Sequence, residues 1–331
     1  MIRVLVQNTL MNANSLNRRD LFKTGGLALG AAALGAGTLT AEAKAEAKSK
    51  FKFGLNLSTI AGPRNATKKL TIVEEVDVAG KAGYEAIEPW MRKIKPYVES
   101  GGSLKDLGKR IKDYGMTVSS AIGFAAWIVD EDDRRAKGLE EMKRDMGWLA
   151  EIGGTRIAAP PAGARRDKPV DIDAAAERYR AVLEIGDETG VVPQVEMWGG
   201  HTSIGTVEKA VYVAIRAGHP KACFLGDIYH TYKGGCDFAG LRLLGPQALQ
   251  NFHMNDYPAD PPRETIKDSD RVYTGDGIAP VSEILRGFAA VGAYPVLSLE
   301  LFNNEYWKRP ALENAKTGLA KMKASVEKAF G

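Results

Sequence analysis

Short hydrophobic runs alternate with longer amphipathic stretches from Phe53 to the end of the chain. The runs are four to six residues long and are bounded by glycine and polar residues, as buried strands are. The runs predicted as strands are Phe53–Leu57, Tyr84–Glu88, Thr117–Ile122, Arg156–Ala159, Pro193–Met197, Ala222–Asp227, Asn251–Asn255 and Val296–Leu301. The amphipathic stretches predict helices near residues 68–82, 103–114, 134–152, 172–189, 205–217, 238–245, 279–292 and 311–329.

Glycine separates several of these helices from the next strand. Gly83, Gly115, Gly190 and Gly292 stand where a helix takes its left-handed C-cap. Because each helix must carry the chain back to the start of the next strand, the β-then-α units imply parallel strands. Eight units favour a closed barrel over an open doubly wound sheet, which would also need a glycine fingerprint opening its first helix. We therefore predict an α/β fold, a single-domain (β/α)8 TIM barrel with eight parallel strands over residues 51–331.

The first fifty residues follow a different pattern. Arg18 and Arg19 precede an uncharged stretch rich in Ala, Gly and Leu, which ends at Ala41-Glu42-Ala43. This resembles a twin-arginine signal, so we expect a signal peptide over residues 1–43, a short linker over 44–50, and a periplasmic or secreted protein that engages the twin-arginine export machinery. The 17-residue uncharged stretch is shorter than the ~20 residues of a spanning helix, so no stable membrane anchor is expected.

The charge balance excludes one class of partner. The chain has 45 basic and 41 acidic residues, and the predicted signal peptide holds four of the basic and two of the acidic ones. The remainder has a net charge of +2 and no basic run, so we expect no nucleic-acid partner. Composition leaves self-association open. Cys223 and Cys236 are predicted as free thiols, because a strand of about 17–20 Å separates them.

Four successive strands end in side chains that bind metals. Glu196, Asp227, His253 and Glu300 each stand at or near the carboxyl end of a predicted strand, where barrel enzymes place their active sites. A buried carboxylate is costly unless it is paired or bound to a cation. Three carboxylates and one imidazole form an oxygen-rich site, so we expect one divalent ion, first Mn²⁺, with Mg²⁺, Co²⁺ or Zn²⁺ as alternatives.

Such a site suits proton transfer next to a sugar carbonyl. The metal would polarise the carbonyl and stabilise an enediolate, while one carboxylate removes a proton and another returns one. We therefore predict a metal-dependent isomerase or epimerase acting on a small carbohydrate. The same enolisation would serve a lyase that eliminates from a keto-sugar or keto-glycoside. A sugar-binding protein without catalysis is a third hypothesis.

The strand-end glutamates, with Asp227-x-x-His230 and His253-x-x-Asp256, resemble the xylose isomerase-like TIM-barrel superfamily, closest to its sugar isomerase/epimerase branch. The resemblance covers roughly residues 53–330. It implies that Glu196, Asp227, His253 and Glu300 bind the metal, that Glu196 and Glu300 form the acid/base pair, and that His230 contacts a substrate oxygen. The metal-dependent endonucleases of this superfamily need more histidines than the four present here.

Two positions depart from the pattern of that branch. Asn255 stands where dehydratase-like members often have lysine, and Thr202 stands where ketose 3-epimerases tend to have a second substrate-binding glutamate.

Further side chains are candidates for substrate binding because they fall in predicted loops at the same end of the barrel. The long polar loop of residues 257–277 is expected to cover the site. Aromatic rings at Trp90, Trp127, Trp198 and Trp307 could stack on the apolar face of a sugar. The residues predicted to bind substrate are His230, His201, Glu88, Trp198, Asp256 and Arg263.

Overall fold

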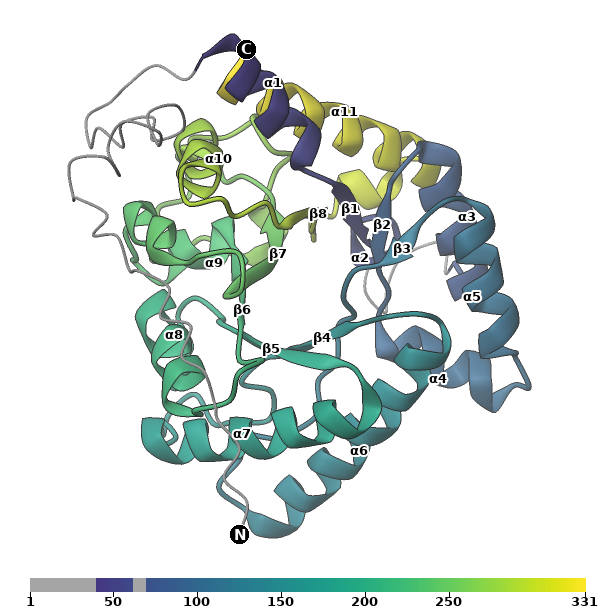
Figure 1. Ribbon diagram of the computed structural model, residues 1–331, viewed down its shortest axis with the longest axis vertical. Coiled ribbons are helices and arrows are strands. Elements are labelled where there is room, and N and C mark those ends of the chain that lie inside the picture. The colour runs from purple at the N-terminus through teal and green to yellow at the C-terminus, as the bar shows by residue number, and fades with distance from the viewer. Residues whose placement is uncertain (1–39, 62–69) are drawn as a thin grey trace, which may run out of the picture. The chain divides into compact units, whose positions relative to one another are not determined.

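The computed structural model describes residues 40–61 and 70–331, and its strands form one sheet that curls around an axis (Figure 1). Most of the predicted signal peptide lies outside the described residues. The strands are β1 (Phe53–Asn56), β2 (Ala86–Glu88), β3 (Thr117–Val118), β4 (Arg156–Ala159), β5 (Val192–Glu196), β6 (Phe224–Asp227), β7 (Leu249–Met254) and β8 (Val296–Leu299).

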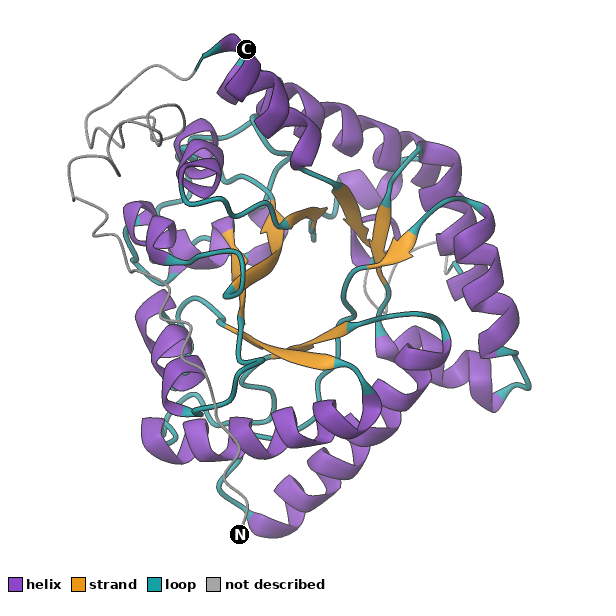
Figure 2. Ribbon diagram, viewed as in Figure 1, coloured by secondary structure: helices purple, strands orange, loops and turns teal. Residues whose placement is uncertain are grey.

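The helices surround the strands (Figure 2). The α-helices are α1 (Ala41–Lys50), α2 (Ser58–Ala61), α3 (Ile72–Ala82), α4 (Met91–Glu99), α5 (Leu104–Asp113), α6 (Asp132–Glu151), α7 (Ile172–Thr189), α8 (Val207–Arg216), α9 (Ile228–Lys233), α10 (Val281–Ala290) and α11 (Ala311–Phe330). Short 3-10 helices are η1 (Phe238–Leu243), η2 (Asp268–Asp270) and η3 (Tyr306–Lys308). Within the described ranges, none of these helices combines the length and the apolarity that crossing a membrane requires.

The strand order confirms the predicted fold. All registered pairs are parallel, in the order β3-β2-β1-β8-β7-β6-β5-β4. The two edges meet where the N–H of Ala158 in β4 donates to the carbonyl of Ala121, just beyond β3, at 2.8 Å. Eight parallel strands followed by helices therefore form one α/β barrel domain.

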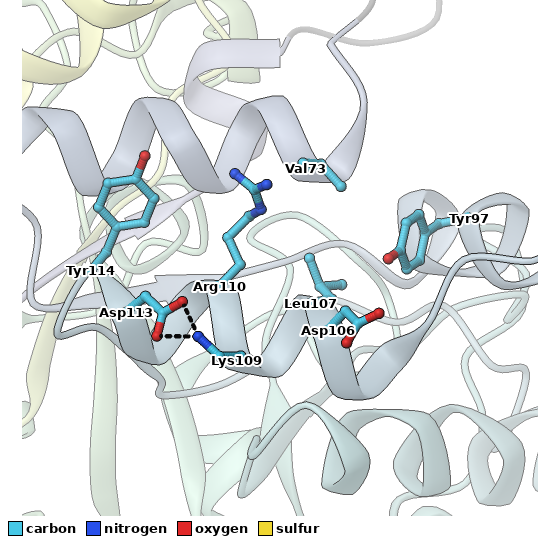
Figure 3. Close-up of a pocket in the computed structure, with 8 residues that line it drawn as sticks. All are labelled: Val73, Tyr97, Asp106, Leu107, Lys109, Arg110, Asp113 and Tyr114. Atoms are coloured by element: carbon cyan, nitrogen blue, oxygen red, sulfur yellow. Dashed lines mark hydrogen bonds and ion pairs between the residues drawn. The ribbon is translucent and has the colours of Figure 1, made fainter.

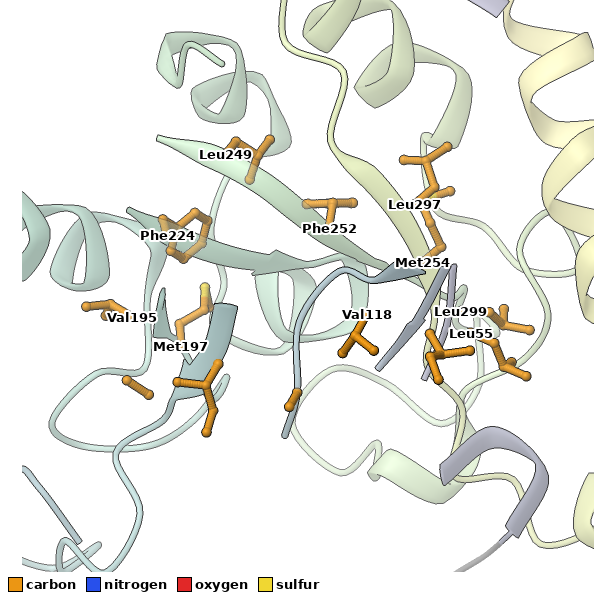
Figure 4. Packing of buried hydrophobic residues seen from close by; sticks show 14 of the residues in the cluster. Leu55, Val118, Val195, Met197, Phe224, Leu249, Phe252, Met254, Leu297 and Leu299 are labelled. Atoms are coloured by element: carbon orange, nitrogen blue, oxygen red, sulfur yellow. The ribbon is translucent and has the colours of Figure 1, made fainter. Parts of the chain in front are cut away.

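The two faces of the strands differ in chemistry. Side chains such as Val195, Phe224 and Leu297 belong to the large hydrophobic cluster that fills the space between strands and helices (Figure 4). Several of their neighbours in sequence are buried polar residues: Gln194 donates to Ser120 at 3.2 Å, and Ser298 donates to Glu88. This alternation follows the two-residue period of a strand, and it directs the strand-end polar residues inward.

Several elements differ from the expectation; α2 and α9, for example, were not predicted. Strand β3 has two residues instead of six, because beyond Val118 the chain continues as a loop in which Ile122 bridges Trp90. Helix α4 was not predicted, and it contains Pro96, a residue that disfavours the interior of a helix. The predicted helix of residues 238–245 is the 3-10 helix η1. Cys223 and Cys236 are both free, as predicted.

Helix α1 occupies the segment in which we expected a linker. Its Ala, Glu and Lys residues have high helix propensity, and Glu46 pairs with Lys50 one turn later at 2.7 Å. Lys48 forms an ion pair with Glu327 of α11 at 3.1 Å. Immediately after α1, Phe51 is 3% exposed and its ring lies 5.9 Å from that of Phe330. The segment before β1 is therefore packed on α11.

This packing predicts unequal effects of two substitutions. Phe51→Ala removes a buried ring and should lower the free energy of unfolding by about 3–5 kcal/mol. Lys48→Ala removes an exposed ion pair and should change it by less than about 1 kcal/mol. Urea unfolding of both variants measures the difference, and equal effects would mean that Phe51 is not part of the core.

Candidate metal centre and active site

The last four strands deliver four ionisable side chains to one end of the barrel. Glu196 ends β5, Asp227 ends β6, His253 lies next to the end of β7, and Glu300 directly follows β8. All four are buried, with exposed fractions of 0–4%. Because β8, β7, β6 and β5 are successive neighbours in the sheet, the two glutamates stand on either side of Asp227 and His253.

His253 lies among the carboxylates, and its two ring nitrogens have different surroundings. Nε2 forms a hydrogen bond to Oε2 of Glu88 at 3.1 Å. Nδ1 lies 3.2 Å from Oε2 of Glu300 and 3.7 Å from Oδ2 of Asp227, but it makes no hydrogen bond. A buried nitrogen without a hydrogen-bond partner is rare in folded proteins, so Nδ1 is the atom that calls for a ligand.

The donor atoms fit one divalent ion. Asp227, His253 and Glu300 offer ligand atoms that all lie within 4.8 Å of one another. Ligands bound at about 2.1 Å to a single ion lie about 3.0–3.4 Å apart at octahedral to tetrahedral angles, close to the two distances from Nδ1. Glu196 does not belong to this group of three but lines the same cavity, where it could supply a fourth ligand.

Electrostatics also favours a cation here. Burial raises the pKa of Glu196 to about 8; the charge of His253 opposes this, and the negative charges of Glu300 and Asp227 add to it. Burial likewise opposes ionisation of Glu300, but His253 and Arg271 outweigh it and hold the pKa of this carboxyl below its ordinary value. Burial lowers the pKa of His253, but Glu300 and Glu88 raise it well above its usual range. A divalent ion would relieve this repulsion among carboxylates.

Arg271 was not among the predicted site residues, yet its guanidinium is fully buried in the site. Nη1 donates to Oδ2 of Asp227 at 3.0 Å and to Oε2 of Glu300 at 2.8 Å. Nη2 donates to Asp268 at 2.5 Å. Because Arg271 is always charged, it partly compensates the two carboxylates and presents a fixed cation to the cavity.

Two asparagines hold the carboxylates in place. Nδ2 of Asn56 donates to Oε1 of Glu300 at 2.8 Å. Nδ2 of Asn255 donates to Oδ2 of Asp227 at 3.0 Å, while its Oδ1 accepts from the N–H of Tyr229 at 2.8 Å. The first hydrogen bond of Asn255 thus orients Asp227, and the second fixes the side chain of Asn255 itself.

His230, a predicted substrate contact, lines the cavity above the carboxylates. Its Nδ1 accepts from the N–H of Gly199 at 3.1 Å, and its Nε2 lies 3.0 Å from Nη2 of Arg271. Burial lowers the pKa of His230, and the charge of Arg271 lowers it further, so the ring is neutral. A neutral imidazole accepts at one nitrogen only, whereas both the N–H of Gly199 and the guanidinium of Arg271 are donors. The two neighbours therefore compete for one acceptor nitrogen, and the other ring nitrogen carries an N–H that neither of them can accept.

The other predicted substrate contacts occupy different places. Trp198 lines the cavity. Glu88 does not line the cavity; its Oε2 accepts hydrogen bonds from His253 and from Ser298. His201 lies in the loop after β5, where Nδ1 accepts from the N–H of Ser203 at 3.1 Å, and does not line the cavity.

Asp256 and Arg263 belong to the long loop that follows β7. The carboxylate of Asp256 accepts from the N–H groups of Tyr257, Gly275 and Ala279 at 2.8–3.0 Å, and so holds the two ends of the loop together. Arg263 is half exposed, lies 3.8 Å from Glu264, and is not among the cavity residues.

The same loop places Arg271 in the site. The backbone of Asp256 pairs with that of Val272, so the loop folds back over the barrel mouth. A sequence signal distinguished the two arginines: Arg263 stands among prolines and a glutamate, whereas the apolar Val272 and Tyr273 follow Arg271. Arginine next to apolar residues was therefore the better candidate for a buried position.

These residues surround a cavity of about 600 Å³ at the barrel mouth. Glu196, His230, Arg271 and Glu300 form its polar floor, and aromatic rings form much of its wall. Trp127, in contrast, is buried and donates to the carbonyl of Pro160 at 2.7 Å, so it belongs to the core.

Another hollow, of about 490 Å³, lies among residues of α3, α4 and α5 (Figure 3). Both of its cations are paired with carboxylates: Lys109 with Asp113 and Arg110 with Asp77, each at 2.7 Å. No histidine lines it. The chemistry therefore lies at the barrel mouth.

Comparison with known proteins agrees with the observed fold. The model of the xylose isomerase-like TIM-barrel family matches residues 76–325. The chain belongs to this family.

An inosose isomerase of Bacillus velezensis is 25% identical over 262 residues, which cover 78% of this chain and 92% of that protein. A 3-dehydroshikimate dehydratase of Pseudomonas putida is 23% identical over 253 residues, which cover 75% of this chain and 39% of that protein.

Two solved structures share the fold. The IolI protein with a bound zinc atom has a TM-score of 0.76 at 20% identity, covering 85% of this chain and all of that one. The 3-keto-D-glucoside 4-epimerase of Escherichia coli has a TM-score of 0.65 at 19% identity, covering 83% of this chain and 99% of that one. The match of the family model confirms the predicted membership of this family, and the two structures share its fold.

The geometry predicts graded effects on metal affinity. Asp227→Ala and His253→Ala each remove a ligand and should abolish stoichiometric binding of a divalent ion. Glu88→Gln keeps the shape but removes the charge that orients His253 and raises its basicity, so affinity should fall about 10–100-fold. Titration calorimetry with Mn²⁺ and Zn²⁺ measures these effects. The matched control is Glu75→Gln, a buried glutamate on α3 that pairs with Lys93 at 2.9 Å. Unchanged affinity in all three site variants would rule out this centre.

Proposed function

We propose that this protein is a divalent-metal-dependent isomerase or epimerase that moves a proton at the carbon next to the carbonyl of a keto-sugar. The observation that carries the proposal is the pair of buried glutamates, Glu196 and Glu300, which enter one cavity from either side of Asp227 and His253. The isomerase and epimerase among the related proteins support the same reaction class.

The proposed ion would be held by Asp227, His253, Glu300 and Glu196. A divalent ion at this place polarises a carbonyl and stabilises the negative charge that forms when the neighbouring carbon loses its proton. The bound zinc atom of the IolI structure supports a metal of this kind.

The remaining roles, proton transfer and orientation of the substrate, fall to different side chains. Glu300, whose pKa is held down, is suited to accept the proton, and Glu196, whose pKa is raised to about 8, is suited to hold and return one. Two carboxyls whose pKa values are pushed apart are typical of an acid/base pair. Arg271 and the Nε2 side of His230 face the cavity and would orient substrate oxygens.

Elimination is the second candidate, because a dehydratase is among the relatives. It shares the proton abstraction but also needs an acid that assists the departing hydroxyl. Asn255 cannot serve as that acid, since its amide has no acidic proton and both of its groups are bound internally. This favours reprotonation at carbon over loss of water.

Deuterium exchange tests the proposal. Metal-loaded protein incubated in D₂O with 3-keto-D-glucose should incorporate solvent deuterium at the carbon next to the carbonyl, without loss of water from the sugar. Glu196→Gln and Glu300→Gln should each reduce exchange by about 10²–10⁴-fold, because a neutral amide cannot carry the proton.

Glu264→Gln provides the matched control, since this glutamate lies in the loop over the mouth but its side chain is 72% exposed. It should retain full exchange. Wild-type exchange in either glutamine variant at Glu196 or Glu300 would remove that residue from the chemistry, and release of water with every turnover would assign the enzyme as a lyase.

We further propose that the protein is exported by the twin-arginine route and works outside the cytoplasm. The support is the pattern of Arg18 and Arg19 before an uncharged stretch and a small-residue cleavage site. Replacing Arg18-Arg19 with Lys-Lys should retain an uncleaved precursor in the cytoplasm, detected by fractionation and immunoblotting. Lys50→Arg, a change of the same kind outside the signal, should be exported normally; equal export of both would refute the proposal.

A further inference from the structure

Five aromatic rings form a continuous arc along the wall of the active-site cavity. Ring centroids of successive members lie 6.5, 6.1, 5.2 and 6.1 Å apart, in the order Trp307, Phe302, Trp90, Phe124, Trp198. The rings come from the segments after β2, β3, β5 and β8, so four separate loops contribute to one surface. Such convergence indicates a built surface rather than incidental packing.

Two rings of this aromatic arc are fixed by hydrogen bonds. Nε1 of Trp90 donates to Oδ1 of Asn56 at 2.6 Å, and the same asparagine holds Glu300. Nε1 of Trp307 donates to the carbonyl of Ser58 at 2.9 Å. The position of these rings relative to the catalytic carboxylate is therefore set before any ligand enters.

The outer part of the arc is exposed. Trp90 is 6% exposed, whereas the next ring, Phe124, is 40% exposed. Among the large exposed apolar side chains of the described residues, Phe124 alone lines this cavity. An exposed phenyl ring costs hydration free energy that a ligand would recover by covering it.

The same cavity also has polar lining residues. Lys267, Asp268 and Ser269 are among them, as is His230. A sugar ring has hydroxyl groups around its edge and apolar C–H groups on its faces, so it matches a cavity lined by both polar and aromatic side chains. The cavity of about 600 Å³ lies in the range of about 300–1,000 Å³ that holds drug-sized ligands, and one hexose fills only part of it.

We infer that Phe124 and Trp198 form a second subsite, which binds a ring attached to the reacting sugar, so that the substrate is a glycoside rather than a free monosaccharide. The inference rests on the proposed function for the position of the reacting ring, which lies over Glu196 and Glu300. With that ring in place beside Trp90 and Phe302, the outer two rings remain uncovered. A sugar or aromatic aglycone stacked on them completes the contact.

The subsite predicts a ranking of ligands. Quenching of tryptophan fluorescence measures the binding of three ligands to the metal-loaded protein: 3-keto-D-glucose, methyl 3-keto-β-D-glucoside and phenyl 3-keto-β-D-glucoside. The phenyl glycoside should bind at least about tenfold more tightly than the free sugar, as a stacked aromatic pair allows. The methyl glycoside should lie close to the free sugar.

Substitutions localise the effect. Phe124→Ala should remove about tenfold of the affinity for the phenyl glycoside and leave the affinity for 3-keto-D-glucose within twofold, while Phe124→Tyr should restore the preference. Trp198→Ala is a second variant with the same expected pattern. The matched control is Leu243→Ala, which removes an apolar side chain that is 83% exposed and lies outside the cavity.

Equal affinity of the wild type for the free sugar and the phenyl glycoside would overturn the inference. So would a preference that survives both Phe124→Ala and Trp198→Ala. Deuterium exchange with 3-keto-D-glucose is measured on the same samples. Absence of exchange together with a preference that depends on the aromatic rings would refute the proposed function but not the subsite. Normal exchange without the preference would refute the subsite but not the proposed function.

Discussion

Mutual repulsion among buried carboxylates at the barrel mouth is the constraint on which the rest of the structure depends. Glu88, Glu196, Asp227 and Glu300 are all nearly inaccessible to water and surround His253. Burying like charges costs free energy unless cations and hydrogen-bond donors compensate them. The protein supplies part of that compensation through neutral donors on neighbouring strands and through one buried guanidinium. An incoming divalent ion would supply the rest, at the place where Nδ1 of His253 lies between the carboxylates of Glu300 and Asp227 without a hydrogen bond.

This constraint explains the course of the loop after β7. Arg271 can compensate the negative charges of Asp227 and Glu300 only if the loop folds back across the mouth of the barrel. Asp256 stabilises this fold by accepting hydrogen bonds from backbone N–H groups at both ends of the loop. Asp256 therefore acts at a distance from the cavity. A residue that matches a family motif can thus serve the site by fixing the backbone that carries another residue, here Arg271.

The barrel could be predicted from the sequence because its information is local. Alternating short apolar runs and amphipathic stretches determine the order of strands and helices, and the position of Asp227 or Glu300 at a strand end determines that it faces the mouth. Tertiary partners are not encoded in this way. Nothing near Glu88 indicates that its carboxylate turns toward His253 beneath the cavity. Likewise, α4 forms around Pro96 because its apolar face packs on the barrel, which overrides the local preference.

The chemistry and the recognition of substrate are carried by different parts of the molecule. The ionisable cluster stands on strand ends, where backbone pairing fixes each position, and Asn56, Asn255 and Arg271 donate hydrogen bonds to its carboxylates. Most of the aromatic arc stands on loops, and its outer ring, Phe124, makes ring contacts with Trp90 and Trp198 but carries no hydrogen bond to the cluster. Loops of a barrel can change without disturbing the strands that bear the reactive groups. The proposed proton transfer could therefore be combined with different substrate-binding loops. Asn56 is the point where the two parts meet, since it binds both Glu300 and Trp90.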